Sequence, residues 1–230
     1  MTIRVGLEFG APGGEYGCGA WVLDLTGCFT AAADEQGALG GVPGAIAKYA
    51  ALLTRHDIPA PRLPTGAARV VQRFRSRWTE PDYEDNAIFA DDLRPVTDRE
   101  VAFVRALLAA SRAELIEAAE LAVRPTGRTV DEVLHHVADA ELFYGTRLED
   151  DPARLRGKLS RDQRDVRARL AEVRRWSEDR IASLPALRSL ERTHRGERWT
   201  PRKVLRRYVY HEIEHLAELR ERCSVPAKTP

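Results

Sequence analysis

Two histidines near the C-terminal end of the chain have a spacing that could hold a metal ion. His211 and His215 stand four residues apart, which places them on one face of a helix, one turn from each other. The same face carries Val204, Tyr208 and Leu219, so it is the inward, mostly apolar face of that helix. Both imidazole rings are therefore expected to point into a core.

A third histidine lies in an earlier amphipathic stretch, and its orientation follows from the same periodicity. His136 shares a helix face with Val133, Ala140 and Phe143. His135 falls on the polar side of the same stretch. We expect the ring of His136 to point inward and the ring of His135 to point to solvent.

Three imidazoles at one end of a small core predict a divalent metal site formed by His136, His211 and His215. Each isolated ring would leave a nitrogen atom unsatisfied in apolar surroundings, whereas one metal ion satisfies all three. Three neutral nitrogen donors suit zinc or nickel and leave coordination positions open, as catalytic sites do. A single inward histidine is usually a hydrogen-bonded core residue, so the prediction depends on the three occurring together.

The segment HEIEH at residues 211–215 also matches the zinc-protease pattern, in which Glu212 would be the general base. Only 15 residues follow His215, and none of them is a histidine. The usual downstream third ligand of that class therefore has little room, and we consider this interpretation the weaker one.

Aromatic residues close to these histidines are candidates for the rest of a catalytic site. Tyr208 lies one turn before His211 on the same face, so its hydroxyl could reach a bound ligand or a substrate oxygen. The alternative for Tyr208 is a core tyrosine whose hydroxyl finds a hydrogen-bond partner. Phe143 and Tyr144 are expected to line the same cleft.

Four amphipathic stretches after Pro95 predict the helices that must carry these residues. They cover residues 98–122, 129–148, 166–185 and 200–223. Thr129 and Glu132 have capping-box spacing, and Thr200 followed by Pro201 is a typical helix start. Four such helices can bury a core of their own, so the sequence predicts an all-α four-helix bundle.

The N-terminal part of the chain has a different periodicity. Residues 2–9 and 18–31 alternate as strands do and are expected to pair antiparallel, with a third strand at 69–78. Apolar residues spaced by three and four predict one helix from Asp34 to about Asp57. This part is therefore expected to be an α+β module, a small antiparallel sheet with one helix.

The change of periodicity suggests two domains. Residues 79–95 are acidic and rich in turn formers, which is typical of a domain boundary. We expect the α+β module and this linker to occupy residues 1–95 and the helical bundle to occupy residues 96–230.

Composition excludes several classes of protein. The 36 basic and 35 acidic residues nearly cancel, so a uniformly basic nucleic-acid-binding surface is not expected. Cys18, Cys28 and Cys223 are odd in number and widely spaced, which argues against both a disulfide framework and a cysteine zinc site. The sequence shows no secretion signal and no apolar run long enough to span a membrane. A cytoplasmic protein without membrane association is expected.

A cluster of arginines lies around the start of the last predicted helix. A solvated surface is the favoured interpretation, and attraction of a carboxylated thiol cofactor is the alternative. The arginines are Arg188, Arg192, Arg195, Arg198, Arg202, Arg206 and Arg207.

Two segments resemble the second and fourth helices of the DinB-like (DinB/YfiT) superfamily. They are TVDEVLHHVADAELFYGTRL and WTPRKVLRRYVYHEIEHLAELR, and the resemblance extends over about residues 98–223. It implies a four-helix bundle with a metal ion held by His136, His211 and His215. The superfamily includes metal-dependent transferases that act with low-molecular-weight thiols, a maleylpyruvate isomerase that uses such a thiol, and members without known activity.

The N-terminal segment WVLDLTGCFTAAADEQGALGGVPGAIAKYAALLTRHDIPAP is similar to the HicB antitoxin family. The resemblance covers about residues 1–62. It implies a small sheet with a helix packed on it, and binding of a protein partner rather than catalysis.

Two functions are consistent with these features. The first is a divalent-metal-dependent transferase or hydrolase of a small-molecule substrate, whose N-terminal module serves homo-oligomerisation or substrate access. The second is a non-catalytic binding or regulatory protein, in which the antitoxin-like module contacts a partner and the bundle is a scaffold. An open metal site costs core stability that a scaffold need not lose, and this favours the first function.

Overall fold

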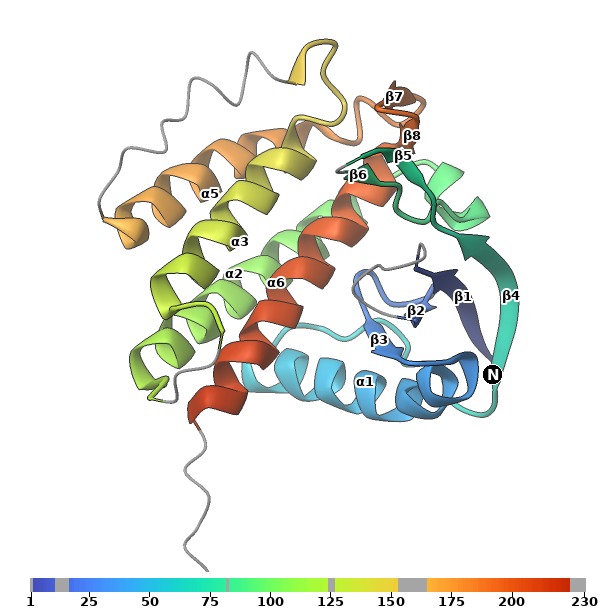
Figure 1. Cartoon of the computed structure of the whole chain (residues 1–230), viewed down its shortest axis with the longest axis horizontal. Helices are drawn as coiled ribbons and strands as arrows, with labels where there is room; N and C mark the ends of the chain where they lie inside the picture. The colour runs from blue at the N-terminus through green and yellow to red at the C-terminus, as the bar shows by residue number, and fades with distance from the viewer. Residues whose placement is uncertain (1, 11–16, 82, 124–126, 153–164, 224–230) are drawn as a thin grey trace, which may run out of the picture.

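The computed structural model describes residues 2–10, 17–81, 83–123, 127–152 and 165–223 of the chain (Figure 1). Within these residues, a small four-stranded sheet and one helix lie beside a group of four further helices. None of the described helices is long and apolar enough to cross a membrane.

The N-terminal sheet has the strand order β3-β2-β1-β4. Its strands are β1 (Ile3–Phe9), β2 (Cys18–Val22), β3 (Phe29–Ala32) and β4 (Ala68–Arg75). The predicted antiparallel pair is present as β1 and β2. The expectation of a wholly antiparallel sheet is wrong, because β4 pairs parallel to β1. The reason is the connection between β3 and β4, a helical crossover, which returns the chain in the direction of β1.

The helix of this module is α1 (Glu35–Arg55). The side chain of Asp34 caps it by accepting a hydrogen bond from the amide of Gly37 at 2.8 Å. Its buried residues, which include Leu52 and Leu53, share the largest apolar cluster with the inward residues of β1 and β2. The helix predicted from Asp34 is therefore confirmed.

The four later helices begin where the sequence predicted them. They are α2 (Asp98–Leu121), α3 (Val130–Gly145), α5 (Val166–Ser183) and α6 (Pro201–Cys223). Thr129 and Glu132 form the predicted capping box of α3. The helix pairs α2–α6, α3–α5 and α3–α6 pack against each other. The helical half of the chain thus places α6, which carries His211 and His215, beside α3, which carries His136.

Short strands occur where none was predicted. The segment expected to be a linker contains β5 (Trp78–Glu80), β6 (Tyr83–Glu84) and the 3-10 helix η1 (Ala90–Leu93). The part expected to be wholly helical contains a hairpin of β7 (Arg192–His194) and β8 (Glu197–Trp199). Arg195 and Gly196 both have positive φ angles, 54° and 79°, which suits a tight hairpin turn. Three-residue strands are too short to produce a detectable period.

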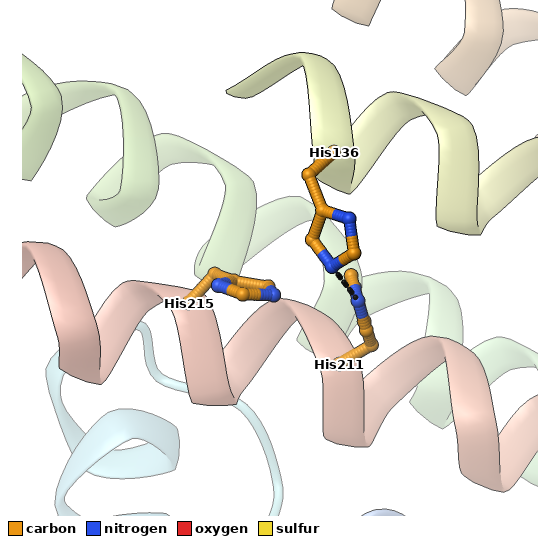
Figure 2. Close-up of side chains that lie close together, drawn as sticks. All are labelled: His136, His211 and His215. Carbon is orange, nitrogen blue, oxygen red and sulfur yellow. Dashed lines mark hydrogen bonds between the residues drawn. The ribbon is translucent and has the colours of Figure 1, made fainter. Parts of the chain in front are cut away.

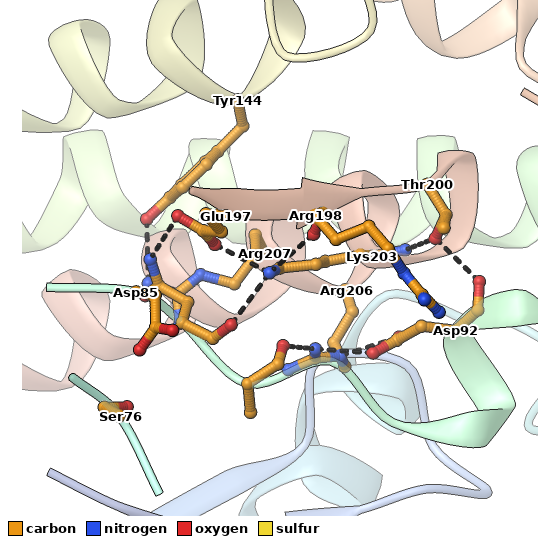
Figure 3. A network of polar contacts seen from close by, with 12 residues as sticks. Ser76, Asp85, Asp92, Tyr144, Glu197, Arg198, Thr200, Lys203, Arg206 and Arg207 are labelled. Carbon is orange, nitrogen blue, oxygen red and sulfur yellow. Dashed lines mark hydrogen bonds and ion pairs between the residues drawn. The ribbon is translucent and has the colours of Figure 1, made fainter. Parts of the chain in front are cut away.

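Buried ion pairs connect the acidic segment to α6 (Figure 3). Arg206 donates two hydrogen bonds to the carboxylate of Asp92, at 3.0 and 2.8 Å. The fully buried Lys203 lies 2.6 Å from Glu197 and donates to the backbone carbonyl of Asn86. The favoured expectation of a solvated arginine cluster is therefore wrong for Arg206, because Asp92 neutralises it inside the protein.

The apolar core also crosses residue 95. The largest cluster of buried apolar residues contains Val5 and Leu7 of the sheet together with Val104 and Val209 of the helices. Gly27, in the turn before β3, has a φ of +77° and approaches Val209 so closely that an added Cβ would lie 2.4 Å from its side chain. The division into domains at residue 95 stays a prediction, and the two parts share one core.

Glu114 of α2 connects this helix to the C-terminal end of α1 and to α6 through hydrogen bonds and an ion pair. It accepts hydrogen bonds from Arg55 and His56, both at 2.8 Å, and pairs with Arg220 of α6. Burial raises the pKa of Glu114, but the hydrogen bonds outweigh burial and hold that pKa below its ordinary value. Its stabilising effect is therefore present above the ordinary carboxyl pKa and is lost as the pH falls through the lowered one.

We expect Glu114→Gln to lower the free energy of unfolding at neutral pH by about 1–3 kcal/mol. The difference from the unmodified protein should shrink as the pH is lowered from 7 toward about 3, because protonation of Glu114 removes its charge as the pH falls through the lowered pKa. Urea denaturation at the two pH values measures this. Glu117→Gln, an exposed position on the same helix, is the control and should have no such effect. A difference that persists unchanged in acid would contradict the prediction.

Candidate metal centre

The three predicted histidines lie together between α3 and α6 (Figure 2). One ligand nitrogen from each ring can be chosen so that all lie within 4.8 Å of one another. The Nε2 atoms of His136 and His211 are 3.1 Å apart. Two nitrogens bound to one tetrahedral ion at ~2.0–2.1 Å lie roughly 3.3 Å apart, so the separation fits a shared metal. Only a small adjustment of the His215 side chain would complete the set.

Burial of the histidines differs from the expectation in one respect. His211 and His215 are 8% and 5% exposed, as predicted for inward residues. His136 is exposed although its ring faces the other two. His135, expected to point to solvent, is half-buried, and its Nδ1 lies 3.0 Å from the guanidinium of Arg169 on α5. The predicted burial of His135 and His136 is therefore wrong. Helix α5 covers the side of α3 that carries His135.

The environment of the rings favours their neutral, metal-binding form. Burial lowers the pKa of His211 well below its ordinary value, and the nearby His215 and His136 add to the effect. Desolvation and the neighbouring His215 lower the pKa of His136 to about 4. Imidazole must be neutral to bind a metal ion, so these two ligands need not lose a proton at neutral pH.

Glu218 orients His215 from one turn further along α6. Its carboxylate lies 2.7 Å from Nδ1 of His215, and it also pairs with Arg222 and Arg128. A carboxylate at this position fixes the tautomer of a histidine ligand, leaving Nε2 free for a metal ion. Glu218 is not among the residues predicted for the site, although its spacing of three residues from His215 on one helix could have indicated this role.

Glu218→Gln is expected to weaken metal binding by about 10–100-fold, because the amide orients His215 less strongly than the carboxylate does. Competition with a chelator of known affinity measures the change. Glu221→Gln is the matched control, since Glu221 lies on the side of α6 toward α1. An equal loss of affinity in both variants would show that Glu218 has no specific role.

Glu212 does not serve the role that the zinc-protease pattern assigned to it. Its carboxylate lies 2.7 Å from Arg112 of α2 and also pairs with Arg174 of α5. Both guanidinium groups contact Glu141 of α3 as well, at 2.7 and 2.8 Å. This four-residue ion cluster takes one residue from each of the four helices. A carboxylate held by two guanidinium groups is a poor general base, because its pKa is lowered even against the effect of burial.

Tyr208 is buried, and its hydroxyl lies against Gly145 of α3, where an added Cβ would be 2.3 Å away. Together with His211, Glu212 and Tyr144 it lines a cavity of about 10 Å³. The burial agrees with the alternative of a core tyrosine, but the hydroxyl has no hydrogen-bond partner among the described residues, which that alternative expected. The catalytic role of Tyr208 stays a prediction. Tyr144 is closer to the histidines, since its ring centre lies 5.8 Å from that of His211.

The two other aromatic candidates have different surroundings. The hydroxyl of Tyr144 accepts a hydrogen bond from Arg207 at 3.1 Å, as Figure 3 shows. Phe143 is half-buried, with its ring 6.0 Å from that of Trp199 and below the guanidinium of Arg147. Tyr144 therefore links the histidine cluster to the buried polar network around Arg207.

Comparison with known proteins gives one match. A family model described as the DinB superfamily matches residues 46–219. No curated protein and no solved structure matches the chain significantly. The comparisons give no support to the HicB-like resemblance of residues 1–62, which stays a prediction.

Proposed function

Because the chain belongs to the DinB superfamily, we propose that it is a divalent-metal-dependent enzyme acting on small molecules, with His136, His211 and His215 as the metal ligands. The observation that carries the proposal is the convergence of three ring nitrogens from two helices. The match to the family model spans all three histidines, which supports the proposal. We also assign α2, α3, α5 and α6 to the four-helix bundle of the superfamily.

The donor set suits zinc or nickel, because three neutral imidazoles bind such ions and leave coordination positions for other molecules. When bound, the ion would supply Lewis acidity that lowers the pKa of a coordinated water or low-molecular-weight thiol and makes it nucleophilic. An S-transferase-like or hydrolase-like reaction is the chemistry that we propose.

The exposure of the three histidines indicates the side from which a small molecule would reach the centre. His211 and His215 are buried, whereas His136 is exposed, so the centre lies at the surface end of the contact between α3 and α6. A small molecule can therefore approach from the side of His136. Glu218 orients the ring of His215. The four-residue ion cluster that includes Glu212 fixes the position of α6 relative to the other helices.

The proposal is tested by metal analysis and by a reaction panel. Purified protein should contain about one divalent ion per chain, and the metal-loaded protein should turn over a member of a panel of small thiols and electrophiles. His215→Ala should lose both properties while remaining folded by circular dichroism. Turnover that survives in His215→Ala, or protein that binds no divalent ion at any concentration tested, would refute the proposal.

A further inference from the structure

A groove of about 500 Å³ lies on the side of α6 that faces away from the histidines. It runs between β3, α1 and α6, and its lining is mostly apolar. Its lining residues include Ala31 of β3, Ala45, Lys48 and Leu52 of α1, and Ile213 and Ala217 of α6. Its volume is in the range of sites that bind ligands, and it is separate from the metal centre.

One wall of this groove is the open edge of the sheet. β3 is the last strand in the order β3-β2-β1-β4 and pairs only with β2. The amide of Val22 donates to the carbonyl of Cys28 at 3.0 Å, and the register then pairs Thr30 with Ala20. Because hydrogen bonding alternates along an antiparallel strand, the N–H and C=O of Ala31 point away from β2. Neither group has a backbone hydrogen-bond partner among the described residues, and Ala31 lines the groove.

The other walls would cover both faces of a strand placed beside β3. Ala45 and Leu52 of α1 lie on one side, and Ile213 and Ala217 of α6 lie on the other. Side chains of a strand point alternately to its two faces, so apolar residues at successive positions would meet α1 and α6 in turn. The groove therefore has the main-chain edge and the apolar walls that strand addition requires.

Charged side chains of both signs line the groove. Glu214 and Glu221 of α6 are acidic, Arg220 of α6 is basic and pairs with Glu114, and Lys48 of α1 is basic. Lys48 of α1 is exposed there and has no ion-pair partner among the described residues. An acidic side chain or a terminal carboxylate on the bound segment would pair with it.

We propose that this groove binds an extended peptide segment of a partner protein, which adds as a strand to β3. The segment carries apolar side chains on both of its faces and a carboxylate that lies near Lys48. This interaction does not depend on the metal centre, because the groove and the histidines lie on different sides of α6.

The proposal is tested by selecting binders from a displayed library of random octapeptides with the full chain. Selected peptides should share an apolar stretch with an acidic residue, and labelled synthetic copies should bind in fluorescence anisotropy. Binding should slow hydrogen exchange at the amide of Ala31, because that N–H becomes bonded to the added strand. A small ligand in the same groove would not protect this amide.

Two variants of α1 make the test specific. Ala45→Glu places a charge inside the groove and should weaken binding by about tenfold or more, whereas Ala47→Glu, on the exposed side, should change it less than about twofold. Lys48→Glu should weaken acidic peptides and strengthen copies in which lysine replaces the acidic residue. Failure to select any peptide, equal effects of the two alanine variants, or unchanged exchange at Ala31 would overturn the proposal.

Discussion

Replacing His211 by alanine is expected to abolish stoichiometric metal binding, from about one divalent ion per chain to almost none. The Nε2 atom of His211 lies 3.1 Å from that of His136, and the ring centre of His211 lies 4.5 Å from that of His215. Two remaining imidazoles cannot form the three-nitrogen site. Elemental analysis after dialysis against a stated zinc or nickel concentration gives the answer directly.

The matched control is His135→Ala. His135 is next to His136 in the sequence, but its ring contacts Arg169 and lies outside the histidine cluster. This variant should retain the ion. Thermal unfolding of both variants without metal separates loss of binding from loss of fold. If the two variants bind equal amounts of metal, the ligand assignment is wrong.

Arg112→Met is expected to lower the free energy of unfolding by about 3–5 kcal/mol, since it leaves Glu141 and Glu212 with a single guanidinium group between them. Both carboxylates are at most 4% exposed, so water cannot replace the lost partner. Chemical denaturation measures the loss. Arg105→Met, an exposed position on the same helix, should change stability by less than about 0.5 kcal/mol.

A double variant distinguishes the charge effect from a packing effect. Arg112→Met combined with Glu141→Leu leaves Arg174 paired with Glu212, so the cluster is again neutral. The double variant should be more stable than Arg112→Met alone, although it removes more of the native side chains. A double variant that is less stable than either single one would show that the buried charges are not the dominant factor.

The sequence predicted those features that depend on local spacing. Thr129 and Thr200 mark helix starts because their side chains and the following residues satisfy the first amides of a helix, and this needs no knowledge of the rest of the fold. The inward position of His211 and His215 was predicted for the same reason, and both are buried. A periodic pattern depends on one helix alone, and the buried faces of α3 and α6 agree with the predicted pattern.

The features that were missed depend on contacts between elements. Lys203, Arg206 and Arg112 are charged, yet each is buried beside an acidic residue of another element. The partners of Arg206 and Arg112 are far away in the sequence, and the partner of Lys203 lies on the preceding hairpin. The half-burial of His135 likewise results from α5, and the parallel pairing of β4 from the position of β1. Such outcomes are determined by the partner element, which a single stretch of sequence does not identify.

Helix α6 is buried without interruption from Lys203 to Glu212, because the sheet covers one of its sides and α2 and α3 cover the others. A polypeptide that began at residue 96 would expose Val209 and Tyr210 to water. It would retain all three clustered histidines but would also expose an apolar surface along α6, so we expect it to self-associate. The N-terminal sheet therefore shields the apolar side of α6 from water.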